Sequence, residues 1–93
     1  MITPDRLEEL AVKVEIWAND RTVARTVYKE FYIKFQIIDD FIRANPKFFE
    51  SDKEYDRAYW ASSFIRITVL TTINSMYMIE DLNHSTIHRP YRV

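Results

Sequence analysis

The chain of 93 residues contains no glycine, and this absence limits the folds open to it more than any other feature. Glycine supplies the left-handed backbone of tight hairpin turns, so a sheet of short-turned strands is disfavoured. Gly-rich phosphate loops, the dinucleotide-binding turn and the nucleophile elbow are excluded as well, because each needs glycine where the backbone turns sharply or touches a ligand. We therefore predict an all-α fold, a small helical bundle that forms one domain over residues 1–93.

The first predicted helix is short and covers residues 4–18. Thr3 can cap an orphan amide at its start, and Pro4 suits the first helical position because its missing donor would have had no partner there. Apolar residues then recur at steps of three and four from Leu7 to Ala18, the spacing of one buried helix face.

The second predicted helix covers residues 20–44. Asn19 or Asp20 can cap its start, although one continuous bent helix stays open because no proline or glycine separates the two segments. Pro46 ends the helix because proline cannot donate the next backbone hydrogen bond. The apolar seam consists of Ala24, Tyr28, Phe31, Phe35, Ile38 and Ile42.

The third predicted helix covers residues 52–82, and Ser51 with Glu54 forms the capping-box pattern at its start. The short connection before it places the second and third helices side by side as a long antiparallel pair. Residues 83–93 have no periodicity and contain Pro90, so we expect a tail that is either irregular or docked on the bundle by Ile87 and Tyr91.

Apolar residues occupy two faces of the third predicted helix. One stripe consists of Ala58, Ala61, Ile65, Val69, Ile73 and Met76, and the other of Trp60, Phe64, Ile67, Leu70, Tyr77 and Met78. Two other helices in so short a chain can cover only one side well, so we predict that the second stripe joins a homo-oligomer or binds a protein partner. The alternative is that the first helix and the tail wrap this helix completely. By spacing alone, Trp17 and Trp60 are expected to be packing anchors.

Two consecutive rings, Phe48 and Phe49, stand in the predicted loop between the second and third helices. Loops usually avoid such pairs, so at least one ring either enters the core or meets a partner. The sequence favours a non-catalytic protein-binding module, an inhibitor or adaptor that acts as an oligomer. Its predicted partner-binding residues are Phe48, Phe49, Trp60, Phe64, Ile67 and Tyr77.

The alternative function is phosphate binding, with a nucleotide or nucleic acid as the ligand. A basic stripe on the second helix would hold the phosphate, and neighbouring rings would stack on a base. A solvated face paired with the acidic first helix explains the same stripe, since Asp39 and Asp40 offset its charge further along. The residues of this alternative are Arg21, Arg25 and Lys29, with Tyr28 and Tyr32 as the stacking rings.

Composition excludes several other classes of function. Thirteen basic and fourteen acidic residues give a net charge of −1, which is unlike a general nucleic-acid binder. The absence of cysteine excludes thiolate catalysis and cysteine-based metal sites, and it fits a reducing compartment. The N-terminus carries acids in place of a basic secretory signal, and Arg66 interrupts the most apolar segment. We expect a cytoplasmic protein with no membrane contact.

Catalytic and metal chemistry lack the necessary residue sets. Asp81, His84 and His88 share a helical spacing, but carboxylate-bridged metal bundles need such a motif on two helices, and this chain has one. The serines have as candidate bases only these two histidines, which stand in or beside the tail. We therefore expect no enzyme activity, no metal and no cofactor.

Overall fold

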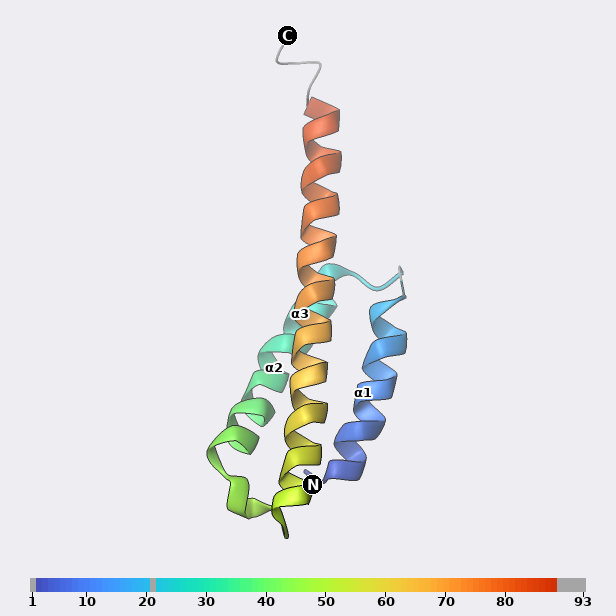
Figure 1. Cartoon of the computed structure of the whole chain (residues 1–93). Coiled ribbons are helices and arrows are strands. Elements are labelled where there is room, and N and C mark those ends of the chain that lie inside the picture. The colour runs from blue at the N-terminus through green and yellow to red at the C-terminus, as the bar shows by residue number, and fades with distance from the viewer. Residues whose placement is uncertain (1, 21, 89–93) are drawn as a thin grey trace.

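The computed structural model describes the backbone of residues 2–20 and 22–88, and it describes side chains only as far as residue 76. The fold is all-α, as predicted, with three helices, α1 (Pro4–Ala18), α2 (Arg25–Ala44) and α3 (Asp52–His88), and a short 3-10 helix, η1 (Pro46–Phe48) (Figure 1). Among the described residues, no helix has the length and apolar character needed to cross a membrane.

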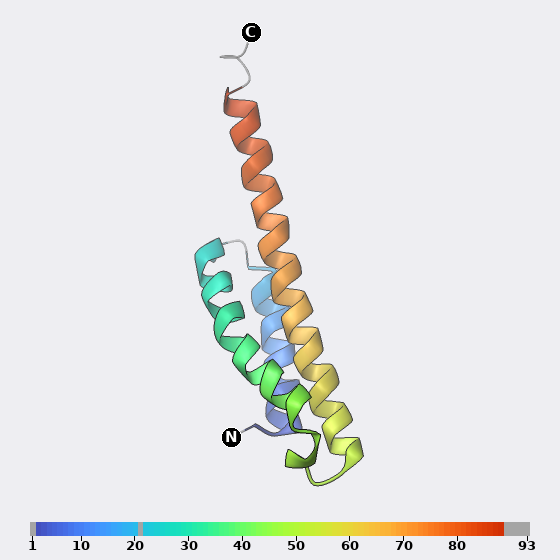
Figure 2. The ribbon, with the colours of Figure 1, turned by 90° about the vertical axis from the view of Figure 1, so that its left-hand side faces the viewer.

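Helix α3 is the central element of the bundle. Both α1 and α2 pack against it, with α1 parallel to α3 and α2 antiparallel to it (Figures 1 and 2). With 37 residues, α3 is longer than the 15-residue α1 and the 20-residue α2, and its C-terminal turns extend beyond both. The molecule is correspondingly elongated, with principal extents of 63 × 23 × 17 Å.

The predicted capping hydroxyls of α1 and α3 accept the expected hydrogen bonds. The Thr3 hydroxyl oxygen accepts a hydrogen bond from the Arg6 amide at 3.2 Å, and Pro4 is the first residue of α1. The Ser51 hydroxyl oxygen accepts one from the Glu54 amide, also at 3.2 Å. Each cap satisfies an amide that the first helical turn leaves without a partner.

The predicted start of the second helix at residue 20 is wrong, because Asp20 stabilises a turn instead of a helix end. Its Oδ1 accepts hydrogen bonds from the Thr22 amide at 2.9 Å and the Thr22 hydroxyl at 2.7 Å. These bonds lower the pKa of the Asp20 carboxyl. Helix α2 begins five residues later, at Arg25, so α1 and α2 are separate helices.

Tyr28 ties this turn to both helices. Its hydroxyl donates a hydrogen bond that is shared between two carbonyl oxygens, that of Trp17 at 2.7 Å and that of Asp20 at 3.0 Å. The Tyr28 and Trp17 rings are in contact, with centroids 4.4 Å apart. Burial raises the pKa of the Tyr28 hydroxyl above its ordinary value, and the charge of Asp20 adds to this effect.

The irregular tail predicted over residues 83–93 is also corrected. Residues 83–88 continue α3, since nothing between Leu82 and His88 breaks a helix. Residues 89–93 lie outside the described part of the chain.

The core forms where the first stripe of α3 meets the other two helices. Ala58, Ala61, Ile65 and Val69 are all buried, which confirms the prediction for this stripe. Ile73 and Met76 are partly buried and pack against the same core. The other helices supply Leu7 and Val14 from α1 and Tyr28, Phe35 and Ile42 from α2.

Candidate protein-binding surface

Three residues of the second stripe of α3 are exposed to solvent, whereas Leu70 is partly buried and the side chains of Tyr77 and Met78 lie outside the described residues. Trp60 is 69% exposed, Phe64 43% and Ile67 55%, and their spacing of four and three residues places them on one side of the helix. We call these three residues the α3 face. Neither α1 nor α2 covers it, so for these residues the predicted incomplete cover is observed, and Trp60 is a surface residue instead of a packing anchor.

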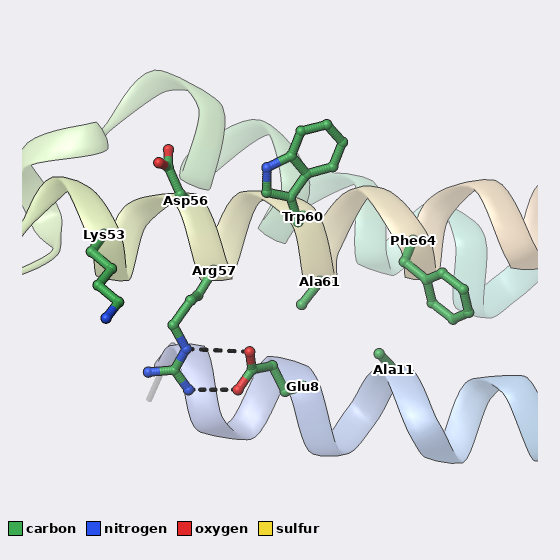
Figure 3. Close-up of a pocket in the computed structure, with 8 residues that line it drawn as sticks. All are labelled: Glu8, Ala11, Lys53, Asp56, Arg57, Trp60, Ala61 and Phe64. Carbon is green, nitrogen blue, oxygen red and sulfur yellow. Dashed lines mark hydrogen bonds and ion pairs between the residues drawn. The ribbon is translucent and has the colours of Figure 1, made fainter.

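A shallow groove with a volume of about 570 Å³ separates part of the α3 face from α1. Ala11 of α1 and Ala61 of α3 line it with small side chains, while Phe64 extends toward Ala11 and Trp60 projects outward (Figure 3). Small residues on facing helices leave space for an incoming side chain. The groove therefore extends the apolar surface of the α3 face toward α1.

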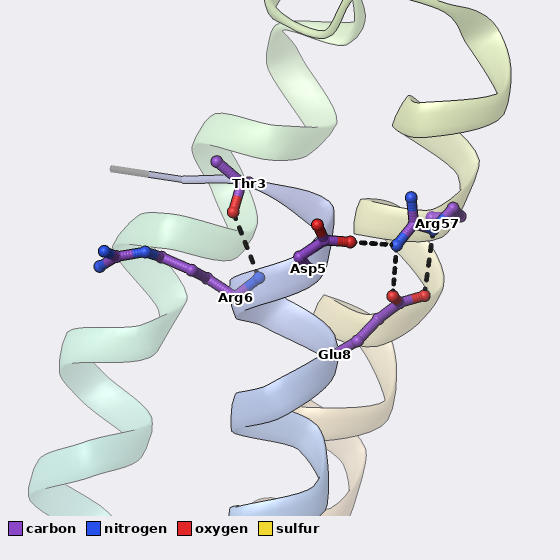
Figure 4. Close-up of polar contacts among 5 residues, drawn as sticks. All are labelled: Thr3, Asp5, Arg6, Glu8 and Arg57. Atoms are coloured by element: carbon purple, nitrogen blue, oxygen red, sulfur yellow. Dashed lines mark hydrogen bonds and ion pairs between the residues drawn. The ribbon is translucent and has the colours of Figure 1, made fainter.

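An ion-pair cluster joins α1 to α3 beside this groove. The Arg57 guanidinium pairs with Asp5 at 2.6 Å, and its Nε donates to Glu8 Oε2 at 3.2 Å (Figures 3 and 4). The hydrogen bonds from Arg57 lower the pKa of Glu8, and those to Glu8 and Asp5 raise the pKa of Arg57. The cluster is exposed to solvent, and we call it the Arg57 cluster.

A second cluster, centred on Asp39, joins α2 to α3. The buried Asp39 carboxylate accepts a hydrogen bond from the Ser62 hydroxyl at 2.7 Å and another from Arg43 Nε at 3.0 Å. Arg66 Nε lies 3.2 Å from the same carboxylate, close enough for an ion pair. It is, however, a buried donor without a hydrogen bond in the described part of the chain. We call this group the Asp39 cluster.

The Asp39 cluster borders the α3 face. The Arg43 guanidinium lies over the Tyr59 ring, 5.1 Å from its centroid, and Arg43 Nη2 is 3.5 Å from the Ser63 hydroxyl. The Tyr59 ring in turn contacts that of Trp60, with centroids 5.6 Å apart. Arginine and aromatic side chains are enriched in the energetically dominant contacts of protein interfaces.

The structure separates the two predicted loop rings. Phe48 is exposed and contacts the Phe41 ring at a centroid distance of 5.1 Å. Phe49 is buried against Tyr55 and belongs to the core, so its assignment as a partner-binding residue is corrected. The Tyr77 side chain lies outside the described residues.

The residues of the predicted phosphate site are only partly available. Lys29 is exposed and Arg25 half-buried, while Arg21 lies outside the described residues. The Tyr28 ring is buried and hydrogen-bonded, so it cannot stack on a base, and this part of the alternative is corrected. Tyr32 is half-buried and packs against the core.

Sequence reasoning missed a second apolar surface, on the outer side of α2. Ile33, Ile37 and Phe41 are exposed at steps of four residues, and Phe48 contacts Phe41 at one end. We call these four residues the α2 face. The spacing of Ile33, Ile37 and Phe41 is a signal for this face, but the same helix also carries the more regular apolar seam through Phe35 and Ile42.

The described residues contain no group of three or more histidine, cysteine or acidic side chains placed to hold a metal ion. No protein-family model matches the chain, and neither a curated protein nor a solved structure matches it.

Proposed function

We propose that this protein is a non-catalytic protein-binding module that uses the α3 face and the adjoining groove. The observation that carries the proposal is the exposure of Trp60, Phe64 and Ile67 on one side of the central helix. Single exposed apolar residues are common, but a contiguous group containing tryptophan and phenylalanine is characteristic of interaction sites.

Burial of the α3 face against a partner would contribute favourable free energy to binding. Burial of apolar surface contributes about 25 cal/mol per Å², and a large aromatic side chain buries roughly 150–250 Å². Trp60 is the largest of the three side chains and the most exposed, so its burial by a partner would contribute the most free energy to binding. We expect it to be the dominant contact residue.

The shape of the surface favours an amphipathic helix of another protein as the partner. The α3 face presents apolar side chains at positions i, i+4 and i+7, the spacing used in helix-to-helix recognition. Ala11 and Ala61 lower the groove floor beside it, which lets the backbone of a docking helix approach. A helix lying along α3 would cover both features.

An adaptor role is favoured over a simple inhibitor because the molecule has two separate apolar faces. The α2 face and the α3 face lie on different helices, so one can contact a partner while the other joins a second copy of the chain. Self-association through the α2 face would also stabilise a domain of this size, which buries limited surface by itself.

Matched substitutions on the two faces test the proposal. We expect Trp60→Glu to abolish co-purification of the cellular partner, while Ile37→Glu retains it and shifts the mass measured by light scattering toward the monomer. Both residues are highly exposed, so circular dichroism should show both variants folded. Equal partner recovery by folded Trp60→Glu and wild-type protein would overturn the assignment of the α3 face.

A further inference from the structure

The Asp39 cluster contains one positive charge more than its own carboxylate can neutralise. Two guanidinium groups, those of Arg43 and Arg66, approach the same oxygen, Asp39 Oδ2, at 3.0 and 3.2 Å. The other oxygen, Oδ1, accepts its hydrogen bond from Ser62. Asp39 therefore offsets one of the two charges, and an excess of +1 stays at the boundary between α2 and α3.

The excess charge lies where an outside group can reach it. The side chains of Arg43 and Arg66 are 38% and 30% exposed, whereas that of Asp39 is 5% exposed. The Nε atoms of both arginines point toward Asp39, and each guanidinium carries further N–H donors that this carboxylate does not occupy. An incoming anion would thus meet donors at the surface while the internal carboxylate stays enclosed.

The two guanidinium groups are also held in place before any ligand arrives. Asp39 and the Tyr59 ring fix Arg43, and the buried Arg66 Nε lies 3.2 Å from Asp39 Oδ2 as an ion pair. Preorganised donors lose less side-chain entropy on binding than free surface arginines do. The contact from Arg43 through Tyr59 to Trp60 places this charge at the edge of the α3 face.

We infer that the partner segment bound by the α3 face carries a carboxylate that docks against Arg43 and Arg66. This inference rests on the proposed function and adds the chemical class of the partner, an acidic amphipathic helix. Its apolar side chains would cover Trp60 and Ile67, and an aspartate or glutamate beside them would neutralise the excess charge. Guanidinium and carboxylate groups form charge-assisted, often bidentate hydrogen bonds.

Two small ligands that differ only in charge test this inference independently of the proposed function. The first is 4-phenylbutyrate, which joins an aromatic ring to a carboxylate, and the second is 4-phenylbutyramide, its uncharged analogue. Binding is followed by NMR from the Trp60 indole N–H and the Arg66 Nε–H signals. We expect the carboxylate to bind about fivefold more tightly than the amide, the ratio that an ion pair of about 1 kcal/mol gives.

Substitutions identify the groups responsible for that ratio. In Arg66→Gln the ratio should fall to about one, in Arg66→Lys it should persist in part because the charge is kept, and in the exposed α1 control Arg6→Gln it should not change. Circular dichroism verifies that each variant is folded, and Arg43→Gln replaces Arg66→Gln if the latter unfolds. Equal binding of both probes to the wild type, with Trp60 shifted by each, would overturn the acidic-partner inference and leave the proposed function intact. If neither probe shifts Trp60 up to its solubility limit, both proposals fail.

Discussion

The two ion-pair clusters that connect α3 to its neighbours use the same chemical groups in opposite surroundings. In the Asp39 cluster the carboxylate side chain is 5% exposed, whereas in the Arg57 cluster Asp5 is 82% exposed and Glu8 48%. The Arg57 cluster has two ion pairs, as the Asp39 cluster does, and its distances of 2.6 and 2.5 Å are shorter than the 3.0 and 3.2 Å of the Asp39 cluster. Burial, and not the number of contacts, is what distinguishes them.

This difference decides what each cluster can do for the fold. Water screens the charges of the Arg57 cluster whether α1 is docked or not, so little free energy of unfolding depends on the pairing. Asp39 is buried and accepts hydrogen bonds from Ser62 and Arg43, and it forms an ion pair with Arg66, so removal of its carboxylate leaves both arginine charges without compensation. The α2–α3 contact should therefore depend on its charges, and the α1–α3 contact mainly on packing around Leu7 and Val14.

The largest expected effect follows from Asp39→Ala. This change removes the one carboxylate between Arg43 and Arg66 and leaves two like charges facing each other across a partly buried site. We expect the free energy of unfolding, measured by urea denaturation, to fall by about 3 kcal/mol.

Asp40→Ala is the matched control, because Asp40 is the adjacent residue and is exposed. Its effect should stay within about 0.5 kcal/mol. Equal losses in the two variants would mean that burial does not separate these carboxylates, and the comparison of the two clusters would fail.

The surroundings of Asp39 illustrate which features of the fold can be predicted from the sequence and which cannot. The three-helix architecture and the inner stripe of α3 were predicted because periodic apolar spacing reports directly on a buried helix face. By sequence alone, Asp39 is expected, together with Asp40, to offset the charge of the basic stripe. Its position four residues after Phe35 and three before Ile42 placed it on the buried seam, so a signal existed. Its partners did not follow from that position, because Arg66 and Ser62 come from another helix whose register the sequence does not fix.

The exposure of the α3 face was predictable from the sequence to a similar extent. The second stripe of α3 was identified from spacing, and the shortness of the chain predicted incomplete cover. Which ring of the Phe48 and Phe49 pair enters the core depends on the path of the loop, and that path is set by contacts with α3. The burial of Tyr28 depends likewise on the position of Trp17, eleven residues away across a turn.

A smaller loss is expected when Asp39 keeps its charge and loses one hydrogen bond. Ser62→Ala removes the hydroxyl that donates to Asp39 Oδ1 at 2.7 Å, at a position with no exposed surface. We expect the free energy of unfolding to fall by about 1.5 kcal/mol, the contribution of a hydrogen bond to a charged group.

The neighbouring residue Ser63 supplies the control for this prediction. It is also buried in α3, but its hydroxyl lies 3.5 Å from Arg43 Nη2 and makes at most a weak bond. Ser63→Ala should therefore cost distinctly less than Ser62→Ala under the same denaturation conditions. The reverse order would show that the Ser62 hydrogen bond to Asp39 contributes little stability.

The smallest effect, and the one that depends most on conditions, concerns Glu8 in the Arg57 cluster. Hydrogen bonds from Arg57 lower the pKa of Glu8 below its ordinary value of 4.5, so the folded chain binds this proton less readily than the unfolded chain does. The stabilisation is therefore complete above pH 4.5 and is lost as the pH falls through the lowered value. Glu8→Gln should reduce the melting temperature slightly at neutral pH and low salt.

That difference from the wild type should shrink in acid, where Glu8 itself becomes protonated, and also in high salt, which screens exposed charges. The same measurements on Glu9→Gln control for the general loss of one negative charge from α1, since Glu9 is the adjacent exposed residue. A large Glu8→Gln effect that persists in high salt would contradict the screened character of the Arg57 cluster. Such a result would mean that the docking of α1 depends on the charge of Glu8, as the docking of α2 is expected to depend on that of Asp39. The contacts α1–α3 and α2–α3 would then differ only in their apolar packing.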